Sequence, residues 1–198
     1  SSMAHIYTLV NQKGGVGKTT TAINLAAFLA QKGQRVLLVD LDPQANATSG
    51  VGLPKDDERS MYRVLIDGMA LREIIRPTEI PTFFVAPSSV DLVGADLELA
   101  DTEKREFRLR KALEPVLADF DYILIDSPPS LGLLTINGLT AAASVLVPMQ
   151  CEYFAIEGIA QLLNTVEKVK DSLNPSLEIE GIALTMFDER VNLARQVA

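Results

Sequence analysis

Short apolar runs recur along the chain, and longer stretches with helical spacing or turn residues separate them. The runs are rich in β-branched and aromatic side chains, and a continuous apolar run of about four to eight residues is typical of a buried strand. The expected strands are 6–10, 35–40, 82–86, 122–126, 144–147 and 178–185.

Apolar residues at helical spacing fill most of the segments between these runs. In 20–31, Ile23, Ala26 and Ala30 lie on one stripe, and Gly33 follows as a stop signal. Further helices are expected over 60–66, 70–75, 92–100, 102–118 and 156–173. Strands that alternate with helices predict an α/β fold: a doubly wound, mostly parallel sheet with helices on both faces.

The chain shows no internal repeat, low-complexity segment or linker, so we expect one domain over residues 1–198. A last helix is expected to begin near Glu189 or Arg190, and the sequence stops at Ala198. A doubly wound domain does not usually finish one or two turns into a helix. We therefore expect the domain to continue in a C-terminal part outside this sequence.

Composition narrows the class of protein. Hydrophobic residues make up 47% of the 198 residues, which argues against disorder. A single cysteine, Cys151, excludes an internal disulfide and favours a reducing cytosol. No apolar run approaches the ~20 residues of a membrane span. The net charge of −8 does not favour nucleic acid, so any DNA contact requires a local basic patch.

The loop between the first expected strand and the first expected helix is typical of a phosphate-binding loop. Backbone N–H groups around Gly14, Gly15 and Gly17 can close on a phosphate at the helix N-terminus, where the helix dipole favours anions. Lys18 then reaches the β- and γ-phosphates, and the Thr19 hydroxyl ligates Mg²⁺.

The same loop departs from the general pattern G-x-x-x-x-G-K-[ST]. Gln12 stands where that pattern has its first glycine, six residues before Lys18. A second lysine, Lys13, lies beside the glycines, and the general pattern gives it no role.

Three aspartates follow two of the expected strands. Asp40 and Asp42 come at the end of strand 35–40, and Asp126 ends strand 122–126. Parallel strands present their carboxyl ends at one edge of the sheet, which is also the edge of the phosphate-binding loop. Carboxylates at this edge can hold Mg²⁺, directly or through water, and can orient an attacking water.

These motifs, in this order and spacing, resemble the ParA/Soj family of chromosome- and plasmid-partition ATPases, within the deviant-Walker-A group that includes MinD. The segments that carry the resemblance are 11–21, 39–50, 125–132 and 148–154, and it extends from about Ile6 to the C-terminus. It implies a P-loop NTPase fold of the deviant Walker A type. It also implies an ATP hydrolase that uses ATP and Mg²⁺ and releases ADP and phosphate.

The resemblance also implies roles for single residues. Lys13 would cross an ATP-sandwiched dimer to the partner's phosphates, in the manner of an arginine finger supplied in trans. Asp42 would position the hydrolytic water, and Asp40 would support Mg²⁺ and a first switch. Asp126 would hold a Mg²⁺-bound water, and the loop over 126–132 would be a second switch. The implied catalytic residues are Lys13, Lys18 and Asp42; nucleotide contacts come from Lys13, Gly14, Gly15, Val16, Gly17, Lys18, Thr19, Thr20, Asp40 and Asp126; and the metal site comprises Thr19, Asp40 and Asp126.

The implied partners are a second copy of the chain when ATP is bound, a ParB/Spo0J-like protein that stimulates hydrolysis, and nonspecific DNA. The implied location is the cytoplasm, on the nucleoid. Arg190 and Arg195 are candidate DNA contacts. The basic run over 104–111 is expected on one helix with acidic residues interspersed, which is typical of a solvated helix face.

Other functions remain open at this point. A MinD-like membrane-recruited regulator predicts lipid binding with ATP, whereas an orphan positioning scaffold predicts ATP-dependent dimers with little turnover. An ATP-dependent small-molecule ligase predicts turnover without DNA or a partner. The nitrogenase iron-protein branch is excluded, because its cluster needs two cysteines per subunit and this chain has one.

Overall fold

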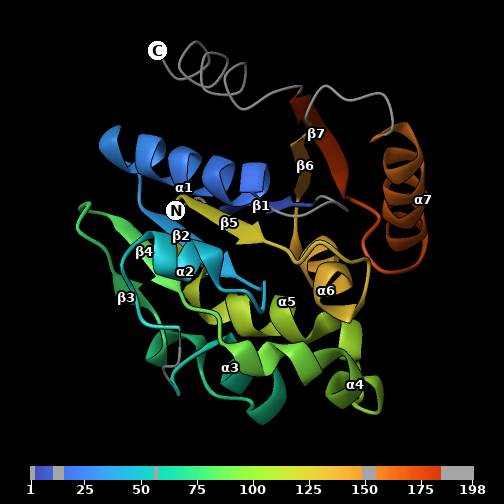
Figure 1. Cartoon of the computed structure of the whole chain (residues 1–198), viewed down its shortest axis with the longest axis horizontal. Helices are drawn as coiled ribbons and strands as arrows, with labels where there is room; N and C mark the ends of the chain where they lie inside the picture. The colour runs from blue at the N-terminus through green and yellow to red at the C-terminus, as the bar shows by residue number, and fades with distance from the viewer. Residues whose placement is uncertain (1–2, 11–15, 56–57, 149–154, 184–198) are drawn as a thin grey trace.

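A seven-stranded sheet forms the centre of the protein (Figure 1). The computed structural model describes residues 3–10, 16–55, 58–148 and 155–183. The strand order is β3-β4-β2-β5-β1-β6-β7, and every neighbouring pair is parallel except β3 and β4. The strands are β1 (His5–Leu9), β2 (Val36–Asp40), β3 (Arg76–Pro77), β4 (Phe83–Ala86), β5 (Tyr122–Asp126), β6 (Ser144–Pro148) and β7 (Glu178–Ala183).

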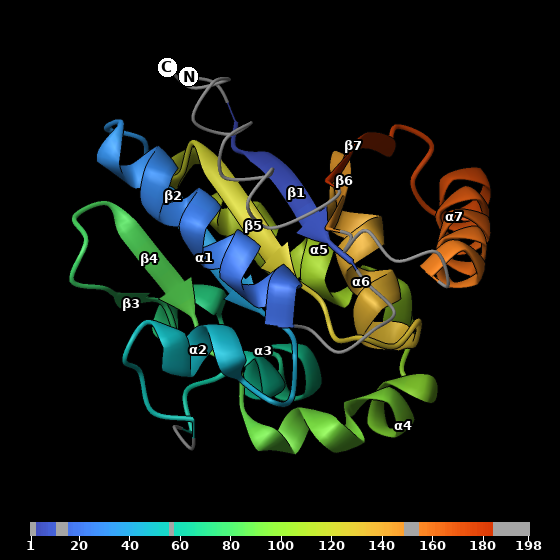
Figure 2. The same cartoon turned by 45° about the horizontal axis from the view of Figure 1, so that its top comes forward.

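Helices cover both faces of this sheet (Figures 1 and 2). The α-helices are α1 (Val16–Gln31), α2 (Asn46–Gly50), α3 (Met61–Asp67), α4 (Ala95–Ala100), α5 (Arg108–Leu113), α6 (Leu133–Ala141) and α7 (Ala155–Ser172). Successive residues of a strand point to opposite faces. In β2, Val36 and Leu38 therefore pack with α1, whereas Leu37 and Val39 pack with α3 and α5. The expected doubly wound α/β fold is confirmed.

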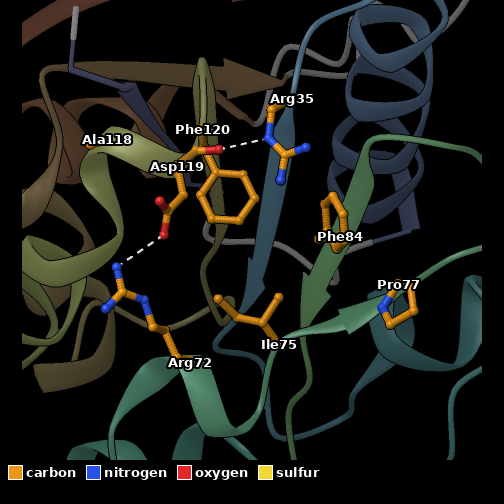
Figure 3. A pocket seen from close by; sticks show the side chains of 8 residues that line it. All are labelled: Arg35, Arg72, Ile75, Pro77, Phe84, Ala118, Asp119 and Phe120. Carbon is orange, nitrogen blue, oxygen red and sulfur yellow. Dashed lines mark hydrogen bonds and ion pairs between the residues drawn. The ribbon is translucent and has the colours of Figure 1, made fainter. Parts of the chain in front are cut away.

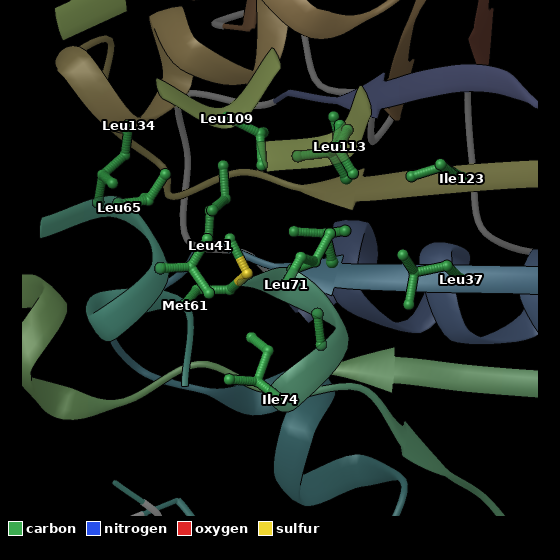
Figure 4. Close-up of a cluster of buried hydrophobic side chains, with 14 of the residues drawn as sticks. Leu37, Leu41, Met61, Leu65, Leu71, Ile74, Leu109, Leu113, Ile123 and Leu134 are labelled. Atoms are coloured by element: carbon green, nitrogen blue, oxygen red, sulfur yellow. The ribbon is translucent and has the colours of Figure 1, made fainter. Parts of the chain in front are cut away.

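The apolar cluster beneath β2 and β5 fixes the second helical layer (Figure 4). Met61 and Leu65 of α3, Leu109 of α5 and Leu134 of α6 are all buried in it, together with Leu41 just after β2. A separate cluster joins α6 and α7 to β6. These contacts hold the strand ends and the helices that follow them in one packed unit.

Two helical predictions were wrong in their extent. The stretch expected as one helix over 102–118 is a 3₁₀ turn (Arg105–Phe107), α5, and a second 3₁₀ helix (Glu114–Asp119). Lys104 has left-handed backbone (φ 51°), and Pro115 lacks the N–H that would continue α5. The basic run over 104–111 therefore does not lie on one helix. Likewise, 92–100 divides into a 3₁₀ helix (Val90–Gly94) and α4.

Other differences follow from local sequence. The segment expected as a helix over 70–75 contains only a 3₁₀ turn (Leu71–Glu73), and β3, α2 and α6 were not expected. In α6, most side chains are buried, including Thr135, Asn137 and Thr140. A helix that is buried nearly all round has no amphipathic stripe for a sequence pattern to reveal. Strand 122–126 matches β5, and the remaining elements differ from expectation by a few residues at their ends, except that residues 184–185 of the last expected strand lie outside the described residues.

The carboxyl ends of three adjacent strands lie level with one another. In the strand register, Asp126 at the end of β5 pairs with Leu9 of β1 on one side and with Asp40 of β2 on the other. The chain runs from β1 toward β2 and β4 and later returns to β6 and β7 on the other side of β1. This reversal marks the crevice in which open α/β sheets bind ligands. None of the helices in the described ranges combines the length and apolarity needed to cross a bilayer.

Candidate functional site

The candidate site lies at the edge where β1, β2 and β5 end, and α1 begins there. Lys18 and Thr19 stand in the first turn of α1, and both are buried. The Lys18 ammonium forms an ion pair with Oδ1 of Asp126. The Thr19 hydroxyl donates to Oδ2 of the same carboxylate at 3.1 Å. The first turn of α1 and the end of β5 are thus tied together by charge and hydrogen bonding.

Burial determines the electrostatics of this pair. Lys18 and Asp126 are both fully buried, so neither charge is solvated by water. Burial raises the pKa of Asp126, while the Lys18 ammonium and the Thr19 hydroxyl act in the opposite direction. A buried lysine in contact with a carboxylate is stable only as a pair, because either charge alone would be costly.

Asp40 is the second buried carboxylate at this edge. Its Oδ2 accepts hydrogen bonds from the Thr48 backbone N–H at 2.9 Å and from the Thr48 hydroxyl at 2.7 Å, and its Oδ1 accepts from the Asp42 N–H at 3.1 Å. Burial, and then the charge of Asp126, raises the pKa of Asp40 to about 7, although the bonds from Thr48 and Asp42 oppose this rise. Near neutral pH, this carboxyl is therefore poised between its two protonation states.

Asp42 completes the set of acidic residues and is also buried. Its Oδ1 accepts from the Gln44 N–H at 3.0 Å, which closes a tight turn after β2. Its backbone carbonyl accepts from the Ser88 hydroxyl at 2.6 Å, and the Ser88 N–H donates to the Thr48 hydroxyl at 2.9 Å. The segment after β4 thereby anchors the segment after β2.

The loop after β5 is anchored in the same way. The Leu41 N–H donates to the Asp126 carbonyl at 2.9 Å, and the Ser127 N–H donates to the Leu9 carbonyl at 3.2 Å. At the end of this loop, Oδ1 of Asp96 in α4 accepts from the Leu134 N–H at the start of α6. The two segments implied as switches are therefore joined to each other and to neighbouring elements.

The structure brings together five of the residues singled out from sequence: Lys18, Thr19, Asp40, Asp42 and Asp126. Thr20 is half-buried on α1, and the backbone of Val16 and Gly17 forms the start of that helix. Lys13, Gly14 and Gly15 lie outside the described residues. So do Arg190, Arg195 and most of the 148–154 segment.

Sequence reasoning missed the supporting residues Thr48, Ser88 and Asp96. Thr48 belongs to the segment 39–50 that carried the family resemblance, but no role was assigned to it. Ser88 follows the end of β4 and therefore lies at the same edge as the candidate site. This position after a strand is the feature of the sequence from which Ser88 could have been predicted. The partner of Asp96 belongs to α6, which the sequence pattern did not reveal.

No group of three or more His, Cys, Asp or Glu side chains with the geometry to hold a metal occurs in the part of the chain that the structure describes. The donors present are the Thr19 hydroxyl and the carboxylates of Asp126 and Asp40, which are hard oxygen ligands. Mg²⁺ in nucleotide sites is usually held by one or two such groups together with phosphate and water. The donor set therefore fits a Mg²⁺ ion that arrives with a phosphate ligand.

A strand, a glycine-rich loop, a buried lysine at a helix start and acidic strand ends together define a P-loop nucleotide-binding domain. The family profile described as "AAA domain" matches residues 4–179. Over 196 residues, the chain is 56% identical to the sporulation initiation inhibitor protein Soj of Bacillus subtilis (strain 168), covering 98% of this chain and 78% of Soj. The chain belongs to the ParA/Soj family of partition ATPases.

A second relative agrees with this assignment, and a solved structure shares the fold. The chromosome partitioning protein ParA of Myxococcus xanthus (strain DK1622) is 54% identical over 198 residues, covering 100% of this chain and 70% of ParA. Among solved structures, the cobyrinic acid a,c-diamide synthase of Mycobacterium smegmatis, crystallised with bound ADP and magnesium, superposes with a TM-score of 0.88. It is 38% identical, and the match covers 98% of this chain and 82% of the synthase.

Proposed function

We propose that this protein is an ATP-driven switch that hydrolyses ATP to ADP and phosphate, dimerises with ATP bound, and drives chromosome or plasmid segregation through nonspecific DNA binding. The observation that carries the proposal is the buried cluster of Lys18, Thr19 and Asp126 at the start of α1. The proposal is also supported by the family membership and by the solved relative, whose crystals hold ADP and magnesium.

The charge balance of the cluster suggests how its residues respond to a nucleotide. Lys18 exchanges its ion pair with Asp126 for the β- and γ-phosphates, which carry more negative charge. Asp126 would then be free to hold a Mg²⁺-bound water, and the Thr19 hydroxyl would be a ligand of the ion. Mg²⁺ supplies positive charge that neutralises the phosphates. Asp40 supports the metal from the end of β2.

Asp42 is proposed to orient the attacking water, because it stands at the same edge on a turn that Gln44 and Ser88 hold in place. Lys13 is proposed to reach the phosphates of a partner subunit, so that dimer formation depends on ATP. ATP binding would be coupled to dimer formation through the hydrogen bonds that join the two switch segments to each other and to neighbouring elements. We also propose that a ParB/Spo0J-like partner stimulates turnover and that the protein works in the cytoplasm, on the nucleoid.

The proposal is tested by measuring how Asp42→Ala binds a DNA duplex, once in the presence of ATP and once in the presence of ADP. The variant should bind ATP without turning it over, so the dimer should persist. We expect binding to a nonspecific duplex with ATP only, and a steep loss of affinity as the salt concentration rises, because each phosphate contact releases counterions. Equal binding with ADP, or none in either state while the ATP dimer still forms, would contradict the DNA-binding part.

A ligase function is the second candidate, because the chain resembles a diamide synthase in structure. The higher identity to two partition proteins favours segregation instead. The two functions differ in kinetics. A ligase should hydrolyse or transfer phosphate at full rate without DNA or a partner protein, whereas a partition ATPase should be slow alone.

A further inference from the structure

Eight residues line a hollow of about 630 Å³ (Figure 3). It lies at the opposite ends of the strands from the nucleotide site. Arg35 immediately precedes β2 and Phe120 lies just before β5, so the hollow is at the amino ends of strands whose other ends carry Asp40 and Asp126. Its volume falls in the range of about 300–1,000 Å³ that is typical of ligand sites.

The side chain of Arg35 is held in a fixed orientation within this hollow. Its Nε–H donates to the Asp119 carbonyl at 2.9 Å, and its backbone N–H donates to Oδ2 of Asp121 at 2.8 Å. The guanidinium carbon lies 5.3 Å from the centre of the Phe84 ring and 6.0 Å from that of Phe120. Among the described residues, no acceptor bonds to the two terminal nitrogens of Arg35. They are available to a ligand.

Arg72 faces the same space from the 3₁₀ turn Leu71–Glu73. Its Nη2 donates to the Pro115 carbonyl at 2.6 Å and to Oδ2 of Asp119 at 3.2 Å. Asp119 therefore positions both arginines, one through its main chain and the other through its side chain (Figure 3). Both Arg72 and Asp119 are exposed, and such surface pairs contribute little to stability. Their effect here is to order two guanidinium groups before any ligand arrives.

An apolar wall completes the hollow between the two arginines. Phe84 and Phe120 pack edge to face with ring centres 5.9 Å apart, and Ile75 lies beside them (Figure 3). A guanidinium group binds a carboxylate through parallel N–H bonds, and an aromatic wall accepts a bulky apolar group. The two features together match a carboxylate that has an apolar neighbour.

We propose that this hollow binds an acidic peptide segment of a partner protein, in which an Asp or Glu side chain stands next to a bulky apolar residue. The charge of the site fits this class of ligand, because its lining carries two guanidinium groups and one carboxylate in a chain of net charge −8. Nucleic acid fits less well. A duplex backbone requires a row of cations, whereas the hollow offers only two guanidinium groups, one of them paired with Asp119.

Amide chemical shifts of the ¹⁵N-labelled chain, titrated with the peptide acetyl-Gly-Glu-Phe-Glu-Leu-Gly-amide, test the proposal. We expect the amides of Ile75, Phe84 and Phe120 to move, with or without ATP bound at the other edge. Arg72→Gln and Arg35→Gln should each weaken binding at least tenfold. Arg63→Gln is the matched control, because Arg63 also forms an exposed ion pair, with Asp67, but does not line the hollow. It should bind like the wild type.

Two further titrations complete the design. A peptide with Gln in place of both Glu residues should bind at least tenfold more weakly, and inorganic phosphate should not move the three amides. If Arg35→Gln lowers the midpoint temperature of thermal unfolding, its weaker binding is not counted, and Arg72→Gln alone decides the role of the arginines. The proposal is overturned if the three amides do not respond to millimolar peptide, or if the Gln peptide binds equally well. It is also overturned if a duplex moves them in an Arg72-dependent manner.

Discussion

At the residue scale, the site is defined by a buried cation, Lys18, paired with one of three buried carboxyl groups. Lys18 contacts Asp126, and the charge of Asp126 raises the pKa of Asp40 one strand away. The loop motif and the strand ends predicted Lys18, Thr19, Asp40 and Asp126 as neighbours. They could not predict Thr48 or Ser88, because those hydrogen bonds join segments that come together only after folding.

Lys18→Ala should abolish ATP binding and lower the free energy of unfolding by about 3 kcal/mol, because it leaves Asp126 buried without its cation. Titration with a fluorescent ATP analogue and urea unfolding measure the two effects. Lys32→Ala, just beyond the end of α1, is the control, since Lys32 is exposed and its ammonium lies over the Phe28 ring, 5.5 Å from the ring centre. Wild-type ATP affinity in Lys18→Ala would contradict the assignment of the loop lysine.

The raised pKa of Asp40 predicts a pH dependence of stability. Its folded-state pKa of about 7 exceeds its ordinary value of 3.8, so its contribution is fully present below 3.8 and is lost as the pH rises through 7. Between about pH 5.5 and 8, the wild type should therefore lose ~2 kcal/mol of unfolding free energy relative to Asp40→Asn. Urea unfolding in EDTA without nucleotide measures this difference. If the difference in unfolding free energy between the wild type and Asp40→Asn does not change with pH, the pKa of Asp40 is not raised.

At the element scale, strands were easier to predict than helices. A buried parallel strand such as β5 is a continuous apolar run, and the sequence shows it directly. In contrast, α6 is buried nearly all round and contains Thr, Asn and Gly residues, so neither periodicity nor helix propensity marks it. The break at Lys104 and the 3₁₀ geometry after Leu113 depend on backbone conformation that apolar spacing does not encode.

Gly138 of α6 tests whether packing or helix propensity dominates there. A Cβ at this position would lie 2.8 Å from the Thr8 hydroxyl and 3.2 Å from that of Ser127, which hydrogen-bond to each other. Gly138→Ala should therefore destabilise the protein by ~1–3 kcal/mol, although propensity alone predicts a gain of roughly 0.5–1 kcal/mol. Thermal unfolding of Gly138→Ala, and of its double variant with Thr8→Ala, measures the clash.

In the double variant, part of the lost stability should return, because the nearest contact is removed. If Gly138→Ala is instead more stable than the wild type, α6 has room to move away from β1. The close approach of α6 to the ends of β1 and β5 would then not be a constraint on the site.

At the scale of the whole molecule, the sheet separates two sites. One edge carries the buried charges of the nucleotide site, and the other carries the hollow between Arg35 and Arg72. The family resemblance and the alternation of strands and helices predicted the first edge. Nothing in the sequence pattern predicted the second, because its lining comes from four separate segments that meet only in the folded protein.

The central claim is that ATP at the phosphate edge controls association of two copies, and sedimentation equilibrium of Asp42→Ala tests it most directly. We predict a dimer with ATP and Mg²⁺ and a monomer with ADP and Mg²⁺. The same variant carrying Lys13→Ala should stay monomeric with ATP while still binding it. A dimer that forms equally with ADP, or an ATP dimer that persists without Lys13, would contradict the account.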